Sequence, residues 1–201
     1  MIKLFSLVSL LIAFSFTKAD TELTQQERDD AVKYSKESLK ALEKEINGLS
    51  ENQLNWRPAD SVWSAADCVE HLALAEKNLF DWAMGSLKEE ANPAKRSELK
   101  MNDDAVKKLI TDRSFKVKTR EGFIPSGQFG TAWESLGVLK ERRASTINYI
   151  METKDDLRNH FVELPFGWID TYQSLLFMSG HTLRHTAQIT ELKTLPGFPK
   201  K

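Results

Sequence analysis

Apolar residues recur at helical spacing in four long segments of the chain, and residues suited to helix N-caps mark where each segment begins. The caps are Thr24, Ser64, Thr131 and Asp170, and each is followed three residues later by a Glu, Asp or Gln that can complete a capping box. The last segment ends before Leu195-Pro196-Gly197, a sequence that stops a helix. This pattern predicts an all-α fold with four long helices.

The apolar face of each predicted helix indicates which residues enter the core. On the second helix, His71 lies on this face, with Cys68 and Ala75 one turn away on either side. The third helix contributes no histidine, and its small residues would let a neighbouring helix approach closely. We expect its inward stripe to comprise Trp133, Leu136, Gly137, Ala144, Ile147 and Met151.

The segments between the predicted helices are polar or rich in Pro and Gly. Residues 89–130 form a connection that is long for a helix bundle, with a short helix capped by Asn102 or Asp103, so it can cross the molecule or cover one end. In the first connector, Trp56 and Trp63 either close one end of the bundle or line a ligand pocket. Phe123, Ile124 and Phe129 likewise either cover the mouth of a pocket or simply anchor the long loop.

Residues 1–19 have the pattern of a secretory signal peptide. Lys3 precedes an apolar run of 13 residues from Leu4 to Phe16, and Thr17-Lys18-Ala19 resembles a cleavage site. The run is shorter than the roughly 20 residues of a membrane span, although an uncleaved N-terminal anchor is the alternative. We therefore expect an exported protein, periplasmic or secreted, with no stable membrane span. Residues 20–201 would form its single domain.

The charge and the cysteine content argue against nucleic-acid binding and exclude an internal disulfide. The full chain has 28 Lys and Arg and 29 Asp and Glu, and loss of Lys3 and Lys18 leaves 26 against 29, a net charge of −3. A mildly acidic protein has no electrostatic basis for binding nucleic acid. Cys68 is the single cysteine, so an internal disulfide is excluded and burial best explains the thiol.

Two histidines on the last predicted helix are the strongest chemical signal. His181 and His185 are four residues apart, which places both imidazoles on one helix face, where they can share a metal ion. The inward-facing His71 is the natural third ligand. His160 falls in a predicted loop and is better suited to a role near the pocket rim or to a structural hydrogen bond than to metal binding.

Three phrases of the sequence together resemble the DinB family of DinB/YfiT-like metalloenzymes. They are WRPADSVWSAADCVEHLALAE, LRNHFVELPFGWIDTYQSLLF and HTLRHTAQI, which occur in family order and belong to a match over roughly Asp29 to Leu192. The resemblance implies a four-helix bundle with up-down-down-up topology, to which the long connection between the second and third long helices is suited. It also implies a divalent metal, zinc or nickel, held by His71, His181 and His185, and it allows a homodimer.

Three nitrogen ligands without a fourth describe an open metal site, which is typical of catalysis, whereas structural zinc sites are normally closed by four ligands. The leading hypothesis is an exported metal-dependent enzyme that acts on a small-molecule substrate, as a hydrolase or, as in other family members, a thiol-dependent transferase. A non-catalytic metal- or ligand-binding bundle and a bundle without metal are the alternatives. Residues whose roles the sequence leaves open are Asp67, Cys68, Glu70, Glu163 and Gln188.

Overall fold

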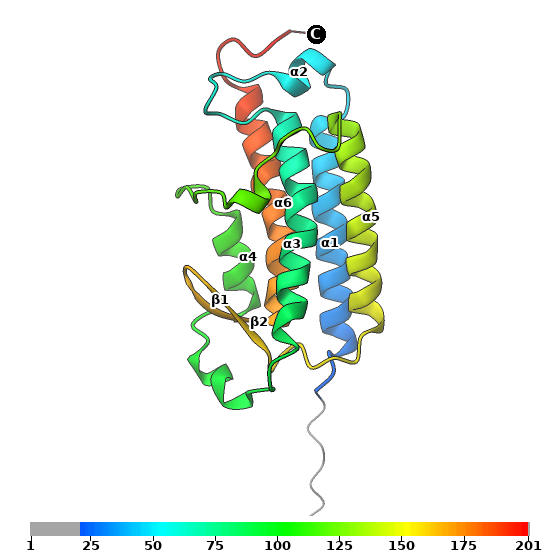
Figure 1. Cartoon of the computed structure of the whole chain (residues 1–201), viewed down its shortest axis with the longest axis vertical. Coiled ribbons are helices and arrows are strands. Elements are labelled where there is room, and N and C mark those ends of the chain that lie inside the picture. Colours follow the sequence, from blue (N-terminus) through cyan, green and yellow to red (C-terminus); the bar gives the residue numbers. More distant parts are fainter. Residues whose placement is uncertain (1–20, 201) are drawn as a thin grey trace, which may run out of the picture.

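The computed structural model describes residues 21–200, and its centre is a bundle of four long helices (Figure 1). The bundle helices are α1 Gln25–Ile46, α3 Ala65–Ser86, α5 Ala132–Glu152 and α6 Thr171–Lys193. Along the long axis of the molecule, α1 and α6 run in one direction while α3 and α5 run in the other (Figure 1). The predicted all-α bundle with up-down-down-up topology is confirmed.

The four helices begin at the predicted residues because each N-cap side chain satisfies backbone N–H groups of the first turn. Thr24, Ser64, Thr131 and Asp170 each form a complete capping box with the residue three positions later. Helix N-termini otherwise leave such groups without partners inside the helix. The helix starts are therefore a local property of the sequence, independent of how the helices pack.

The connection between α3 and α5 returns the chain to the end of the bundle where α3 begins. It contains three helical elements, which are η1 Pro93–Glu98, α4 Asp103–Thr111 and η2 Glu121–Phe123. Of these, α4 packs against α6, and η2 packs against α3 (Figure 1). Because the chain has returned before α5 starts, α3 and α5 are parallel neighbours.

Two segments predicted as irregular connectors contain short regular elements, so the prediction was wrong there. One is α2 Glu51–Asn55, a helix of little more than one turn. The other is an antiparallel hairpin of β1 Phe161–Leu164 and β2 Gly167–Asp170, in which Leu164 pairs with Gly167. Gly167 has φ of 122°, a conformation that favours glycine, and so closes the turn. The hairpin leads directly into α6.

The buried face of α5 differs from the predicted stripe, of which only Leu136 is buried. Trp133 is 41% exposed and Met151 is 56% exposed. The helix is rotated because polar side chains occupy its inner face, above all Arg143, which is 1% exposed and bound to Glu76 of α3. The residues of α5 that are buried are Ala132, Ser135, Leu136, Leu139, Arg143, Thr146 and Ile150.

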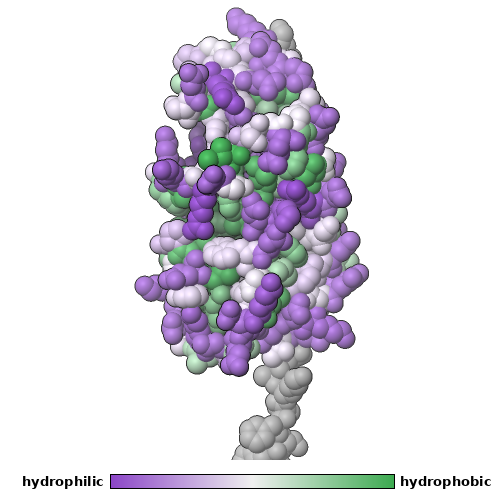
Figure 2. All heavy atoms as spheres, viewed as in Figure 1, coloured by the Kyte–Doolittle hydropathy of each residue, from purple (hydrophilic) through white to green (hydrophobic). Residues whose placement is uncertain are grey.

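The predicted signal peptide, residues 1–19, lies outside the described residues. Its cleavage and export stay predictions that the N-terminal sequence of the exported protein would test. Within residues 21–200, no helix is both long and apolar enough to cross a membrane. Figure 2 shows mostly hydrophilic side chains on the viewed face, with apolar side chains gathered near the place where η2 crosses α3.

Candidate metal centre

The structure brings together the three histidines that the sequence analysis identified. His71 extends from α3, and His181 and His185 extend from successive turns of α6, the helix packed against α3. The Nε2 atom of His181 lies 3.2 Å from Nε2 of His71 and 3.1 Å from Nε2 of His185. Within residues 21–200 these histidines form the one group of three or more potential ligands, whose ligand atoms all lie within 4.8 Å of one another.

The opposite ring nitrogens of two histidines face oxygen acceptors. His71 Nδ1 lies 2.7 Å from the backbone carbonyl oxygen of Phe123, and His185 Nδ1 lies 2.9 Å from Oε1 of Gln188. A carbonyl oxygen only accepts, so we assign the proton of each ring to Nδ1. In this tautomer the Nε2 atoms of His71 and His185 each carry a free lone pair, and both atoms lie beside Nε2 of His181. Zn–N bonds of about 2.1 Å in tetrahedral geometry would place two nitrogens roughly 3.4 Å apart, close to the observed spacing.

Burial keeps the three imidazoles in the neutral form that binds metals. Burial lowers the pKa of His71, and it lowers the pKa values of His181 and His185 well below the ordinary value of 6.5. For His181 the imidazole of His71 lowers the pKa further, and for His185 those of His181 and His71 do so. Near neutral pH the nitrogens are therefore available as ligands without prior loss of a proton.

The same burial predicts that acid destabilises the metal-free protein. The lowered pKa values mean that the unfolded chain binds more protons than the folded chain below pH 6.5, so the free energy of unfolding falls as the pH decreases through that value. We expect this in urea titrations of chelator-treated protein between pH 7.5 and 5, with a flatter dependence in the His181→Ala/His185→Ala variant. Asp170, whose pKa is raised by burial to about 6, titrates in both proteins and cancels in the comparison. Equal slopes for the two proteins would contradict the prediction.

Aromatic side chains surround the three imidazoles. The Trp63 ring centroid lies 4.7 Å from that of His71 and 6.0 Å from that of His185. Phe177 is stacked nearly parallel to His181 at 6.2 Å, and Phe166 of the hairpin turn is stacked on Phe177 at 5.9 Å. Trp63 also packs against the hydrophobic core, so it contacts both the histidines and the core at this end of the bundle.

A family model described as the DinB superfamily matches residues 35–189, more than half of the chain. The chain belongs to the DinB superfamily. It is 26% identical over 152 residues to the uncharacterized protein YuaE of Bacillus subtilis strain 168, a match that covers 74% of this chain and 88% of YuaE. The DinB resemblance inferred from the three sequence phrases is thus confirmed.

A solved structure supports the same fold for this DinB-superfamily chain. YfiT from Bacillus subtilis, described as a probable metal-dependent hydrolase with an unusual four-helix bundle topology, aligns with a TM-score of 0.55. The alignment covers 85% of this chain and 88% of YfiT at 19% identity. At that identity the likeness establishes the bundle architecture, while the chemistry must be argued from the residues of this chain.

The remaining polar candidates have other roles. Asp67 accepts hydrogen bonds from Ser64 in the capping box and from Arg57 at 2.7 Å. His160 is outside the histidine group, and its Nδ1 lies 3.0 Å from the Ser86 carbonyl oxygen, which agrees with a structural hydrogen bond, one of the two roles considered for it. Glu163 is an exposed residue of β1.

Cys68 and Gln188 lie near the histidines but are not part of the group of potential metal ligands. Cys68 is fully buried in the core, and burial raises the pKa of its thiol, so it behaves as the small apolar residue expected from the sequence. Gln188, whose role the sequence left open, contacts Nδ1 of His185 through its side-chain oxygen. Sequence reasoning missed the contact of Phe123, because a backbone carbonyl has no signature in residue type.

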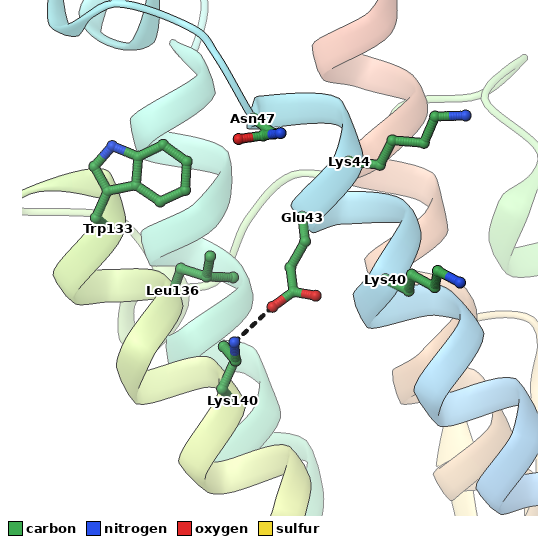
Figure 3. A pocket seen from close by; sticks show the side chains of 7 residues that line it. All are labelled: Lys40, Glu43, Lys44, Asn47, Trp133, Leu136 and Lys140. Atoms are coloured by element: carbon green, nitrogen blue, oxygen red, sulfur yellow. Dashed lines mark ion pairs between the residues drawn. The ribbon is translucent and has the colours of Figure 1, made fainter.

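A groove on the outer surface is separate from the histidines. It has a volume of about 450 Å³ and lies between α1 and α5, beside the exposed Trp133 (Figure 3). The ion pair of Lys140 and Glu43 bridges it at 2.7 Å. No histidine or cysteine lines it, so we assign it no chemistry.

Proposed function

We propose that His71, His181 and His185 hold one divalent metal ion and that the protein is a metal-dependent hydrolase of a small-molecule substrate. The observation that carries the proposal is the convergence of three imidazole nitrogens within 4.8 Å, supplied by two helices. The proposal agrees with membership of the DinB superfamily and with the description of YfiT as a probable metal-dependent hydrolase.

The donor set fits a borderline metal ion with open coordination positions. Neutral imidazole nitrogens suit zinc, nickel and related divalent ions, whereas calcium and magnesium prefer oxygen ligands. Among the described residues no fourth potential ligand joins the group, which suits a catalytic site more than a closed structural one. Because all three ligands are imidazole nitrogens, we prefer zinc or nickel as the bound metal.

The surrounding residues would orient the ligands and limit access of water. The Phe123 carbonyl and Gln188 fix the rings of His71 and His185 through Nδ1. Trp63 and Phe177 cover the rings, so polar contacts at the centre act in a water-poor environment where they are stronger. When bound, a divalent ion supplies Lewis acidity for hydrolysis.

Non-catalytic binding is the second candidate, and one observation favours it. Glu70, the carboxylate next to His71 in the sequence, has both oxygens bonded to backbone N–H groups, so it is committed and poorly placed to accept a proton as a general base. A protein that captured a metal or a ligand without turnover would need no such base.

Metal analysis combined with activity measurements tests the proposal. Untagged protein, purified without a nickel column, should contain about one divalent ion per chain by mass spectrometry. A panel of ester, amide, lactone and thiol-conjugation substrates is then assayed with native, chelated and metal-restored protein. Hydrolysis that is lost on chelation and restored by zinc or nickel is the expected result. Metal without turnover would favour the binding protein, and protein that neither contains nor takes up a metal would refute the site.

A further inference from the structure

Glu70 uses its buried carboxylate to hold the loop that follows η2. The side chain is 5% exposed and accepts hydrogen bonds from three consecutive backbone N–H groups, those of Ser126 at 3.0 Å, Gly127 at 2.8 Å and Gln128 at 3.0 Å. Hydrogen bonds to an ionised acceptor are roughly twice as strong as neutral ones. One carboxylate thus fixes three residues of a segment that has no regular secondary structure at this point.

The same segment carries the acceptor for a metal-site histidine. Phe123, three residues before Ser126, presents its carbonyl oxygen to His71 Nδ1, and the next residue back, Gly122, accepts a hydrogen bond from Asn78 at 2.8 Å. None of residues 121–130 is buried, and Ile124 is 49% exposed. At the two ends of the segment, the Phe123 ring lies 6.3 Å from the His71 ring and Phe129 packs against the core. The residues between them are exposed or half-buried, so the hydrogen bonds from Asn78 and to Glu70 are what hold this part of the chain against α3 (Figure 1).

We propose that Glu70 is a positioning residue for the metal centre, acting through the segment of residues 122–128 on His71. By fixing Ser126, Gly127 and Gln128, Glu70 keeps the Phe123 carbonyl at Nδ1 of His71, which sets the tautomer and the orientation of the ring. Loss of this contact frees the ring to rotate and to place its proton on Nε2, the atom required for the metal. This inference rests on the proposed metal site.

Two variants of Glu70 and one matched control test the inference. Glu70→Gln keeps the shape but puts an amide NH2 where one backbone N–H needs an acceptor, and Glu70→Asp keeps the charge but shortens the reach by one methylene. The control is Glu134→Gln, which neutralises an exposed carboxylate that accepts a backbone N–H bond from Thr131 and is not among the contacts of the histidines. Hydrogen exchange of the peptide covering residues 122–128 is measured on metal-free protein, and Zn²⁺ affinity is measured by chelator competition.

We expect Glu70→Gln to speed exchange in residues 122–128 and to weaken Zn²⁺ binding about 10–100-fold, as for other outer-shell partners of metal ligands. In Glu70→Asp the two effects should appear together and in proportion, and Glu134→Gln should show neither. Faster exchange with wild-type affinity, or weakened binding with unchanged exchange, would overturn the role of Glu70. If wild-type protein binds no Zn²⁺, the proposed function fails. The exchange data would still show whether Glu70 fixes residues 126–128.

Discussion

Replacing His185 by alanine is expected to abolish stoichiometric metal binding, with a loss of affinity of at least about a hundredfold. The estimate is a lower limit, because changes to residues that only support a ligand already cost 10–100-fold. His185 is 8% exposed, and its Nε2 lies 3.1 Å from Nε2 of His181. Within residues 21–200, no other His, Cys, Asp or Glu belongs to the group and could replace it. Metal content after untagged purification and Zn²⁺ titration against a chelator measure the effect. Any metal-dependent activity should disappear with the metal.

His160→Ala is the matched control for this experiment. It removes an imidazole of the same size that contacts the Ser86 carbonyl oxygen and is not part of the histidine group. We expect wild-type metal content and affinity for this variant, with circular dichroism showing that both variants retain their helices. Full occupancy in His185→Ala, or equal losses in both variants, would show that the three converging nitrogens are not the metal site.

The histidine group was predictable because its position follows from local rules. Capping boxes set the first residues of α3 and α6, and from there the helical repeat alone places His181 and His185 on one face and His71 on the apolar face of its helix. Since two helices pack through their apolar faces, the three rings were expected on the shared face, and the structure shows them at the same level along the two helices. The family resemblance supplied the topology, which local rules cannot specify.

The parts that sequence reasoning missed depend on contacts distant in the chain. The inner face of α5 was misassigned because apolar periodicity treats an arginine as an outward residue, whereas Arg143 finds its partner Glu76 on a helix 67 positions away. The contact of the Phe123 carbonyl with His71 and the stacking of Phe166 on Phe177 of α6 likewise depend on how a loop and a hairpin fold back onto the bundle. Each strand of the hairpin has only four residues, and Pro165 lies in the turn between them, so the alternation of apolar and polar residues is too short to predict a strand.

Replacing Arg143 by methionine is expected to lower the free energy of unfolding by about 3–5 kcal/mol, the cost of leaving one member of a buried ion pair without its partner. The side chains of Arg143 and Glu76 are 1% and 3% exposed. Their two hydrogen bonds measure 2.6 and 2.8 Å, and the guanidinium also donates to Ser38 and Thr182. The arginine of α5 thereby links three other bundle helices. Urea denaturation of metal-free protein measures the loss.

The control is Lys140, which lies on α5 like Arg143 but forms its ion pair with Glu43 of α1 at the surface. Lys140 and Glu43 are separated by 2.7 Å, but their side chains are 53% and 35% exposed, so Lys140→Met should cost less than about 1 kcal/mol (Figure 3). The double variant Glu76→Leu/Arg143→Met should recover part of the loss of Arg143→Met, because it removes the uncompensated carboxylate as well. Similar losses for Arg143→Met and Lys140→Met would contradict the assignment of Arg143 to the core. A large difference would show that the buried polar side chains on the inner face of α5 are important for the stability of the bundle.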